Sequence, residues 1–228
     1  MKLLLFDIDG TMILTHGIGR RSVELALSEV AERPIDSTSV SFSGKTDPQI
    51  IQEVYEANGL DSVSLNGMLD AALDRYSYHL KRHLRPERVE VLPGFPDLLD
   101  VLVDRDDVAL GLLTGNLEPL AYLKLNAVGL ADYFPFGAFG SDDADRYMLP
   151  AVAAKRAKEH VGRDFRGTDV VIIGDTEHDI GCGRGAGAFC VAVCTGRFDR
   201  ACLSAHGADV LFDDLSDTDS FLQVVLGN

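Results

Sequence analysis

The fold is decided near the start of the chain by the stretch Leu3-Leu4-Leu5-Phe6-Asp7-Ile8-Asp9-Gly10-Thr11. Four apolar residues that stop abruptly at a polar one are typical of a strand buried on both faces of a parallel sheet. Two carboxylates, Asp7 and Asp9, follow this strand at once. Ligands of open α/β sheets bind at the carboxyl ends of the strands, so both carboxylates are candidate site residues.

Similar patterns recur along the chain and predict an α/β protein. Apolar runs typical of strands occupy residues 108–113 and 170–173, and weaker runs occupy 136–139, 189–193 and 209–212. Helical patterns lie between them, at residues 117–128, 149–161, 177–186 and 216–226. This alternation indicates a doubly wound, mainly parallel sheet that is covered by helices on both faces.

Residues 15–92 break the alternation, because they contain no convincing strand and only helical periodicity. Three apolar helix faces can be traced, formed by Val23, Ala26, Leu27 and Val30, by Ile50, Ile51, Val54 and Tyr55, and by Leu65, Met68, Leu69, Ala72, Tyr76 and Leu80. Asp47-Pro48 has the pattern of an N-cap followed by proline in the first turn. We therefore expect an α/β core of residues 1–14 and 93–228, with residues 15–92 inserted as a helical cap domain.

Three polar clusters each follow directly on a predicted strand. They are Asp7-Ile8-Asp9-Gly10-Thr11, Thr114-Gly115-Asn116 and Gly174-Asp175-Thr176-Glu177-His178-Asp179. If the strands are parallel, all three clusters emerge at the same edge of the sheet. Residues that are more than ~160 positions apart in the chain would then share one crevice.

Such a crevice would crowd together the carboxylates of Asp7, Asp9, Asp175 and Asp179. Carboxylates that repel one another at close range are best compensated by a hard divalent cation. Magnesium takes carboxylate, water and phosphate oxygens as ligands, and it neutralises charge on a transferring phosphoryl group. Thr114 and the backbone N–H groups of its turn could donate hydrogen bonds to phosphoryl oxygens. A carboxylate could then attack phosphorus and form an aspartyl phosphate.

The overall charge limits the partners of the chain. Its 36 acidic and 21 basic residues give a net charge of −15, which disfavours binding to nucleic acid or to anionic membranes. A phosphate site in this protein must therefore carry its own positive charge. The apolar start of the chain meets Asp7 too early for a secretory signal, and no window has the roughly 20 apolar residues that cross a bilayer. A cytoplasmic location and four reduced, buried cysteines are expected, at Cys182, Cys190, Cys194 and Cys202.

At the three clusters the sequence resembles the haloacid dehalogenase superfamily of hydrolases, whose motifs read D-x-D-G-T, T-G-N and G-D-x-x-x-D. The helical insertion resembles the branch with phosphoglycolate phosphatases and β-phosphoglucomutases. The resemblance implies that Asp7 is the nucleophile and a Mg²⁺ ligand, and that Asp9 is the general acid/base and binds the metal through its backbone carbonyl. It further implies phosphate binding by Thr114 and metal binding by Asp175, with Asp179 acting through water or a neighbour. Motif residues expected at the substrate are Thr11, Gly115 and Asn116, although Asn116 also fits a plain N-cap.

The basic residue of this family departs from its usual K-P-x-P pattern. The corresponding segment reads Asp145-Arg146-Tyr147-Met148-Leu149-Pro150, and Arg146 is preferred because it precedes the helix and is permanently charged. Lys155, inside that helix, is the alternative. Lys45 lies in a glycine-containing turn before a helix, where a cap could lower a cation onto the substrate. Arg20 and Arg21 are interpreted as an exposed, charged helix face.

Together these features predict a magnesium-dependent phosphatase that hydrolyses a small phosphorylated metabolite, a phosphate monoester, through an aspartyl phosphate on Asp7. A sugar phosphomutase would use the same residues, and a phosphonatase would add an imine-forming lysine of the cap. Carbon–halogen cleavage is disfavoured by Asp9 and the magnesium site. A non-catalytic binding protein is disfavoured by the four carboxylates, because unpaired buried carboxylates are costly unless they are used.

Overall fold

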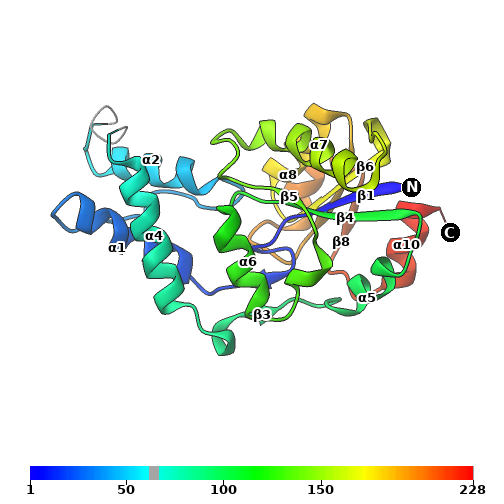
Figure 1. The fold of residues 1–228 in the computed structure, drawn as a ribbon, viewed down its shortest axis with the longest axis horizontal. Helices are drawn as coiled ribbons and strands as arrows, with labels where there is room; N and C mark the ends of the chain where they lie inside the picture. The colour runs from blue at the N-terminus through cyan, green and yellow to red at the C-terminus, as the bar shows by residue number, and fades with distance from the viewer. Residues whose placement is uncertain (62–66, 228) are drawn as a thin grey trace.

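The structure, a computed structural model, describes residues 1–61 and 67–227. In this part of the chain, six parallel strands form one sheet in the order β5-β4-β1-β6-β7-β8 (Figure 1). The strands are β1 (Lys2–Phe6), β4 (Val108–Leu113), β5 (Gly137–Ala138), β6 (Val170–Gly174), β7 (Phe189–Val193) and β8 (Val210–Phe212). The first strand, β1, lies in the middle of the sheet. The chain then adds β4 and β5 on one side of β1, and afterwards β6, β7 and β8 on the other side. The predicted doubly wound parallel sheet is therefore confirmed.

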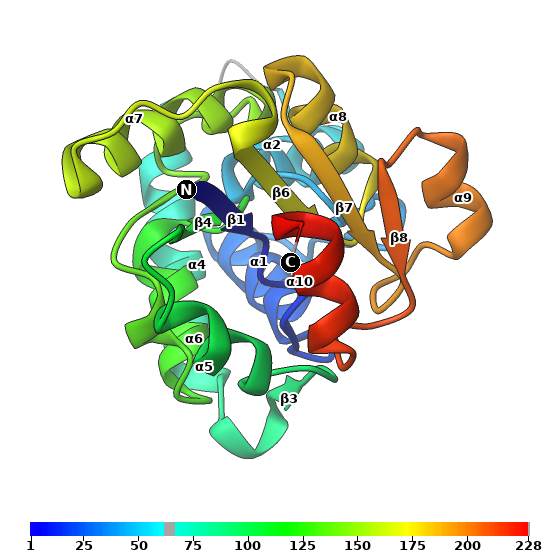
Figure 2. The same ribbon diagram turned by 90° about the vertical axis from the view of Figure 1, so that its right-hand side faces the viewer.

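Helices cover both faces of the sheet because alternate side chains of β1 enter two different cores. Leu4 and Phe6 pack on the side of α5 (Asp97–Val103), α6 (Glu118–Asn126) and α10 (Thr218–Leu226) (Figure 2). Leu3 and Leu5 pack on the side of α7 (Leu149–Val161) and α8 (Glu177–Ala186). All four side chains are fully buried, and burying each contributes about 1.5–3 kcal/mol to stability. A further short helix, α9 (Arg200–Ala205), packs beside α8 and β8.

The register of the central strands brings the three polar clusters to one edge. Phe6 lies opposite Leu112 of β4 and opposite Ile173 of β6. The next residue, Asp7, donates its backbone N–H to the carbonyl of Ile173 at 2.9 Å. The strands β1, β4 and β6 thus end at the same level, and the residues that follow them lie side by side.

The stretch between β1 and β4 is mainly helical. Its helices α1 (Ile18–Val30), α2 (Asp47–Ala57) and α4 (Leu69–His83) pack on one another at the end of the molecule away from both termini (Figure 1). A short antiparallel ribbon, β2 (Ile13–Leu14) paired with β3 (Glu90–Val91), joins the entry of this helical insertion to its exit. The expectation of no strand within residues 15–92 is wrong for β3, because two residues are too few to show a period. The division into a cap domain and a core remains a prediction. Leu65, which was assigned to the third apolar helix face, lies outside the described residues.

One helix starts at a different residue from the one predicted, and two short helices were not predicted. Thr46 caps α2, because its side-chain oxygen accepts the N–H of Gln49 at 3.3 Å, and Asp47 is instead the first residue of the helix. The Thr46 hydroxyl also donates to the carbonyl of Ala144 at 2.7 Å. Helices α5 and α9 were not predicted, since seven and six residues are too short for a clear apolar face.

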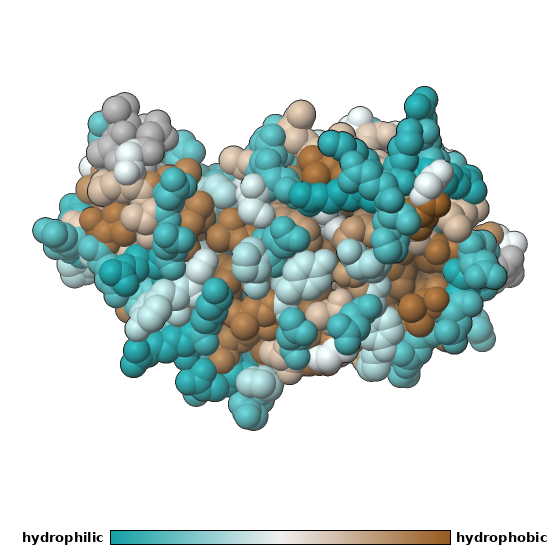
Figure 3. All heavy atoms as spheres, viewed as in Figure 1, coloured by the Kyte–Doolittle hydropathy of each residue, from teal (hydrophilic) through white to brown (hydrophobic). Residues whose placement is uncertain are grey.

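On the face drawn in Figure 3, hydrophilic residues dominate and hydrophobic residues show only as separate patches between them. Within residues 1–61 and 67–227, none of the helices has the length and apolar character needed to span a bilayer. The four cysteines are unpaired; Cys182 and Cys190 are buried as expected, whereas Cys194 and Cys202 are only half-buried.

Three loops meet closely because glycines carry no side chain there. A Cβ on Gly115 would lie 2.0 Å from the carbonyl oxygen of Lys45, and one on Gly140 would lie 2.1 Å from that of Gly115. Backbone hydrogen bonds link the same loops, from Asp47 N–H to Gly115 at 2.7 Å and from Gly140 N–H to Asn116 at 2.8 Å. The start of α2 is therefore docked directly on the loop that follows β4.

We expect Gly140→Ala to lower the free energy of unfolding by about 1–3 kcal/mol, because its methyl group would collide with the backbone of Gly115. Urea unfolding monitored by circular dichroism measures this change. Gly185→Ala is the matched control, since Gly185 lies in α8 and a Cβ there meets nothing within 4 Å. The control should be unchanged or up to about 1 kcal/mol more stable. Equal stability of the two variants would contradict the described loop packing.

Candidate active site

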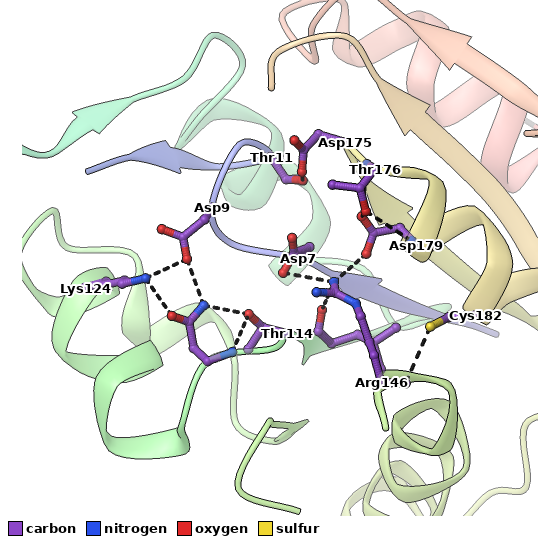
Figure 4. Close-up of polar contacts among 12 residues, drawn as sticks. Asp7, Asp9, Thr11, Thr114, Lys124, Arg146, Asp175, Thr176, Asp179 and Cys182 are labelled. Atoms are coloured by element: carbon purple, nitrogen blue, oxygen red, sulfur yellow. Dashed lines mark hydrogen bonds and ion pairs between the residues drawn. The ribbon is translucent and has the colours of Figure 1, made fainter. Parts of the chain in front are cut away.

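Asp7 lies at the centre of the site, at the end of β1. Its carboxylate is buried and lies 3.2 Å from Nη2 of Arg146, which stands just before α7 (Figure 4). The same nitrogen donates to Oδ1 of Asp179 in the first turn of α8, at 2.5 Å. Oδ2 of Asp179 accepts the backbone N–H and the hydroxyl of Thr176, which is the N-cap of α8. A capping box thus holds Asp179, and Asp179 in turn helps to hold Arg146 against Asp7.

An acidic group (Asp7, Asp175 and Asp179) forms on this side of the site. One carboxylate oxygen from each residue lies within 4.8 Å of the others, and all three residues are buried. Burial raises the pKa of Asp7 to about 6; Arg146 opposes the rise, whereas Asp179 and Asp9 add to it. Burial and the neighbouring carboxylates of Asp179 and Asp7 likewise raise the pKa of Asp175 well above its usual range. Three carboxylates and one guanidinium leave an excess of buried negative charge, and an all-oxygen donor set suits Mg²⁺.

Asp9 lies apart from the acidic group. Its Oδ2 accepts hydrogen bonds from Lys124 at 2.6 Å and from Asn116 at 2.8 Å, on the opposite side of Asp7 (Figure 4). Its side chain is 39% exposed, whereas the three other carboxylates are buried. Three of the four expected carboxylates therefore lie together, whereas Asp9, whose charge still adds to the raised pKa of Asp7, binds the Lys124 ammonium instead. The metal role predicted for Asp9 involves its backbone carbonyl and does not depend on this side chain.

The loop after β4 supplies the neutral part of the site. Thr114 is buried, and its Oγ1 accepts the side-chain amide of Asn116 at 2.8 Å and the backbone N–H of Asn116 at 3.4 Å. Leu117, not Asn116, occupies the N-cap position of α6, so the side chain of Asn116 serves the site. Thr11 was expected at the substrate but is buried, and it donates to Oδ1 of Asp175 at 3.4 Å. It supports the acidic group and does not belong to the wall of the cavity described below.

Arg146 and Lys155 differ sharply in position. Arg146 is 3% exposed and contacts Asp7, whereas Lys155 is exposed on α7. Burial alone would lower the pKa of Arg146, but the carboxylates of Asp179 and Asp7 more than offset this and raise it. Arg146 is therefore the basic residue that the fold brings to the site, in agreement with the preferred sequence interpretation.

Two residues of the site, Lys124 and Asp47, were not predicted from the sequence as site residues. Lys124 of α6 is 3% exposed, and its ammonium binds Asp9 and Asn116. The sequence did contain a signal for Lys124. It lies on the same helix face as the apolar residues Leu120 and Ala121, and a lysine on such a buried face is expected to have a partner for its charge. Asp47 is also buried, and its Oδ2 accepts the N–H of Leu117 at 2.8 Å.

The helical insertion contributes two cations. The ammonium of Lys45 forms an ion pair with Glu53 of α2, and its side chain is 17% exposed. Arg20 is not the exposed helix residue that the sequence suggested. It donates hydrogen bonds to Ser37 and Val40, and its guanidinium lies 4.1 Å from the ring centroid of Phe42. Arg21 is exposed, as expected.

A cavity of about 480 Å³ lies between the sheet edge and the helical insertion. Its polar wall on the sheet side contains Asp7, Asp9, Thr114, Gly115, Asn116, Lys124, Arg146 and Asp175. The facing wall combines the cations Arg20 and Lys45 with Asp47, Tyr76 and the apolar residues Ile13, Leu14, Phe42 and Ile50. The cavity therefore presents a charged floor below a partly apolar roof, and its volume suits a small molecule.

The model of haloacid dehalogenase-like hydrolases matches residues 4–193. The chain belongs to this family of enzymes, as the three motifs indicated. Its relatives include pyrophosphatase PpaX of Oceanobacillus iheyensis, which is 23% identical over 220 residues, covering 95% of this chain and 94% of the relative. Phosphoglycolate phosphatase of Neisseria meningitidis is 26% identical over 208 residues, covering 89% of this chain and 84% of the relative.

Solved structures share the same fold. A "predicted phosphoglycolate phosphatase" from Haemophilus somnus superposes with a TM-score of 0.74 at 18% identity, covering 98% of both chains. A β-phosphoglucomutase from Clostridium difficile gives a TM-score of 0.74 at 17% identity, covering 100% of this chain and 97% of that one. The fold of this chain is thus shared, over nearly its whole length, with these solved structures.

The buried carboxyl of Asp47 should make stability depend on pH. Burial raises its pKa to about 6, against 3.8 for an ordinary aspartate, although Lys124 opposes the rise. Between these values the folded state binds the proton that the unfolded state releases, so stability should increase as pH falls from 7 to 5. Between pH 7 and pH 5, we expect the free energy of unfolding of the metal-free wild type to increase by about 1 kcal/mol more than that of Asp47→Asn.

Urea unfolding at pH 7 and pH 5 measures the difference. Asp106→Asn is the control, because Asp106 is an exposed aspartate and its replacement should leave the pH dependence of the wild type unchanged. Identical pH dependence of the wild type and Asp47→Asn would show that Asp47 does not take up this proton.

Proposed function

We propose that this chain is a magnesium-dependent phosphatase that hydrolyses a small phosphate monoester through an aspartyl phosphate on Asp7. The observation that carries the proposal is the division of the carboxylates around Asp7. On one side of Asp7 lie Asp175, Asp179 and Arg146, and on the other side Asp9 stands at the cavity with Asn116 and Lys124. A nucleophile between a cation site and a proton donor is what phosphoryl transfer to a carboxylate requires.

In the first step, the Asp7 carboxylate attacks phosphorus, and the bond from phosphorus to the leaving oxygen breaks. Asp9 gives its proton to that oxygen, so the product alcohol leaves neutral. In the second step, Asp9 takes a proton from a water molecule that attacks the phosphorus of the aspartyl phosphate. Inorganic phosphate leaves, and the Asp7 carboxylate is restored.

The remaining residues bind and orient. The Thr114 hydroxyl and the backbone N–H of Gly115 would donate hydrogen bonds to phosphoryl oxygens. Arg146 would hold the Asp7 carboxylate in place through the contact at 3.2 Å. Lys45, at the cavity wall, would add positive charge near the phosphate or its leaving group.

The acidic group suits Mg²⁺, with Asp7 and Asp175 as ligands together with the backbone carbonyl of Asp9. Both oxygens of Asp179 already accept hydrogen bonds, from Arg146 and Thr176, so Asp179 would act through water or its neighbours. Bound Mg²⁺ would supply charge neutralisation between the Asp7 carboxylate and an anionic phosphate.

Phosphate release from a panel of small phosphate esters tests the proposal, and phosphoglycolate and pyrophosphate belong in it because relatives are named for them. We expect turnover of at least one ester with Mg²⁺, loss of activity in excess chelator and recovery when Mg²⁺ is restored. Calcium should replace magnesium poorly, because it prefers more ligands at longer distances. Asp7→Asn should lower kcat by several orders of magnitude with the fold retained, since an amide cannot attack phosphorus.

Other outcomes separate the alternatives. Full activity in chelator would contradict the metal role, and more than a few per cent of activity in Asp7→Asn would contradict the nucleophile. Turnover that depends on a sugar bisphosphate and releases little phosphate would indicate a phosphomutase that uses the same residues.

The cytoplasmic location remains a prediction.

Lys45 separates a phosphatase from a phosphonatase. As a charge that steadies an anion, Lys45 can be replaced by arginine with much of the activity kept, whereas Lys45→Ala should lose about 10- to 100-fold, or roughly 1.4–3 kcal/mol. A phosphonatase needs the lysine amine to form an imine, which a guanidinium cannot do. Steady-state kinetics of both variants, and borohydride trapping with a carbonyl-bearing phosphonate, provide the measurement.

A trapped adduct at Lys45 together with an inactive Lys45→Arg would establish the phosphonatase alternative. Wild-type activity in Lys45→Ala would contradict both roles. Glu53→Gln serves as a control, because it keeps Lys45 but removes its ion-pair partner.

A further inference from the structure

Lys124 is a buried cation that the proposed reaction does not yet use. It comes from the second turn of α6, and its side chain is 4% exposed. Its ammonium lies 2.6 Å from Oδ2 of Asp9 and 2.6 Å from Oδ1 of Asn116. A buried ammonium is costly unless its protons are bound, so these two acceptors explain how the fold tolerates it.

The ammonium determines how the amide of Asn116 is oriented. An ammonium can only donate, so the amide oxygen must face Lys124 and the NH₂ group must face the other way. That NH₂ group donates to Oδ2 of Asp9 and to Oγ1 of Thr114, both at 2.8 Å. The hydroxyl proton of Thr114 is then directed away from Asn116, because its oxygen is already an acceptor. One charge thus sets the direction of every hydrogen bond in this part of the site.

Both donors converge on the same oxygen of Asp9. Oδ2 receives Lys124 and Asn116, whereas Oδ1 accepts no hydrogen bond from residues 1–61 or 67–227. Asp9 lines the cavity, and its side chain is 39% exposed. Held at one oxygen, the carboxylate cannot turn freely, and its other oxygen, which has no bond drawn in Figure 4, is left available to a molecule in the cavity.

We propose that Lys124 is a positioning residue for the reaction: with Asn116 it fixes Oδ2 of Asp9, so that Oδ1 exchanges the proton with the leaving group and then with water. The inference rests on the proposed phosphatase function. Lys124 does not touch the substrate in this role and acts through Asp9 and the amide of Asn116. A purely structural role, as a counter-charge for the buried Asp47 carboxylate, is the competing explanation.

The dependence on the leaving group distinguishes the two roles. An alkyl phosphate needs a proton on its leaving oxygen, whereas p-nitrophenyl phosphate releases a stable nitrophenolate without one. The ratio kcat/KM reports the first phosphoryl transfer. For Lys124→Met we expect kcat/KM to fall about tenfold more with the best alkyl ester of the panel than with p-nitrophenyl phosphate, with kcat affected more than KM. Asp9→Asn should give the same pattern with a larger loss.

Two further variants complete the experiment. Asn116→Ala keeps the ammonium but removes the second donor to Asp9, and it should reproduce the selective loss on the alkyl ester even if Lys124→Met does not fold. Lys155→Met is the matched control, because Lys155 is exposed on α7, and both substrates should be turned over as by the wild type.

The outcomes are separable. Equal losses on both substrates in Lys124→Met and in Asn116→Ala would show that the pair is only structural, and unchanged kinetics would show that it has no role; either result overturns the inference and leaves the phosphatase intact. A wild type without turnover of any phosphate ester would contradict the proposed function itself, and this inference with it.

Discussion

The site depends on the register of β1 between β4 and β6. Because Phe6 lies opposite Leu112 and Ile173, the three strands end at one level, and Asp7, Thr114 and Asp175 follow at a common edge. A shift by a single residue would turn Asp7 to the other face of the sheet and place Phe6 at the edge. The fully buried, alternating side chains of β1 oppose such a shift, since each enters its own helical layer. Core packing thereby positions the chemistry.

Placing several carboxylates at one edge creates an electrostatic problem, and the protein solves it with two buried cations on opposite sides of Asp7. Arg146 holds Asp7 and Asp179, and Lys124 holds Asp9. The separation matters because Asp7 and Asp9 then have different environments. Asp7 is buried among other carboxylates, whereas Asp9 is partly exposed at the cavity. Different environments allow residues of the same chemical type to serve different roles.

The helical insertion is coupled to this edge by short contacts. Thr46 donates to Ala144, Asp47 binds the loop after β4 through its backbone and its carboxylate, and glycines at positions 115 and 140 allow the backbones to meet. The buried phenol of Tyr76 hydrogen-bonds Asp47, so α4 joins the same network. The helical insertion is therefore docked directly on the loop that carries Thr114 and Asn116.

The sequence alone determined the alternation of strands and helices, the principal helices and the motif residues, because apolar periodicity and the polar residues that end a strand are local patterns. It also favoured Arg146 over Lys155, because Arg146 precedes α7 and is permanently charged. Only the tertiary structure decided that Asp9 leaves the other carboxylates, that Lys124 and Asp47 belong to the site, that Thr11 supports Asp175 and that Arg20 faces the cavity. Lys124 and Asp9 are 115 positions apart, and their contact depends on how α6 packs on the sheet. No local pattern encodes which buried charge meets which partner.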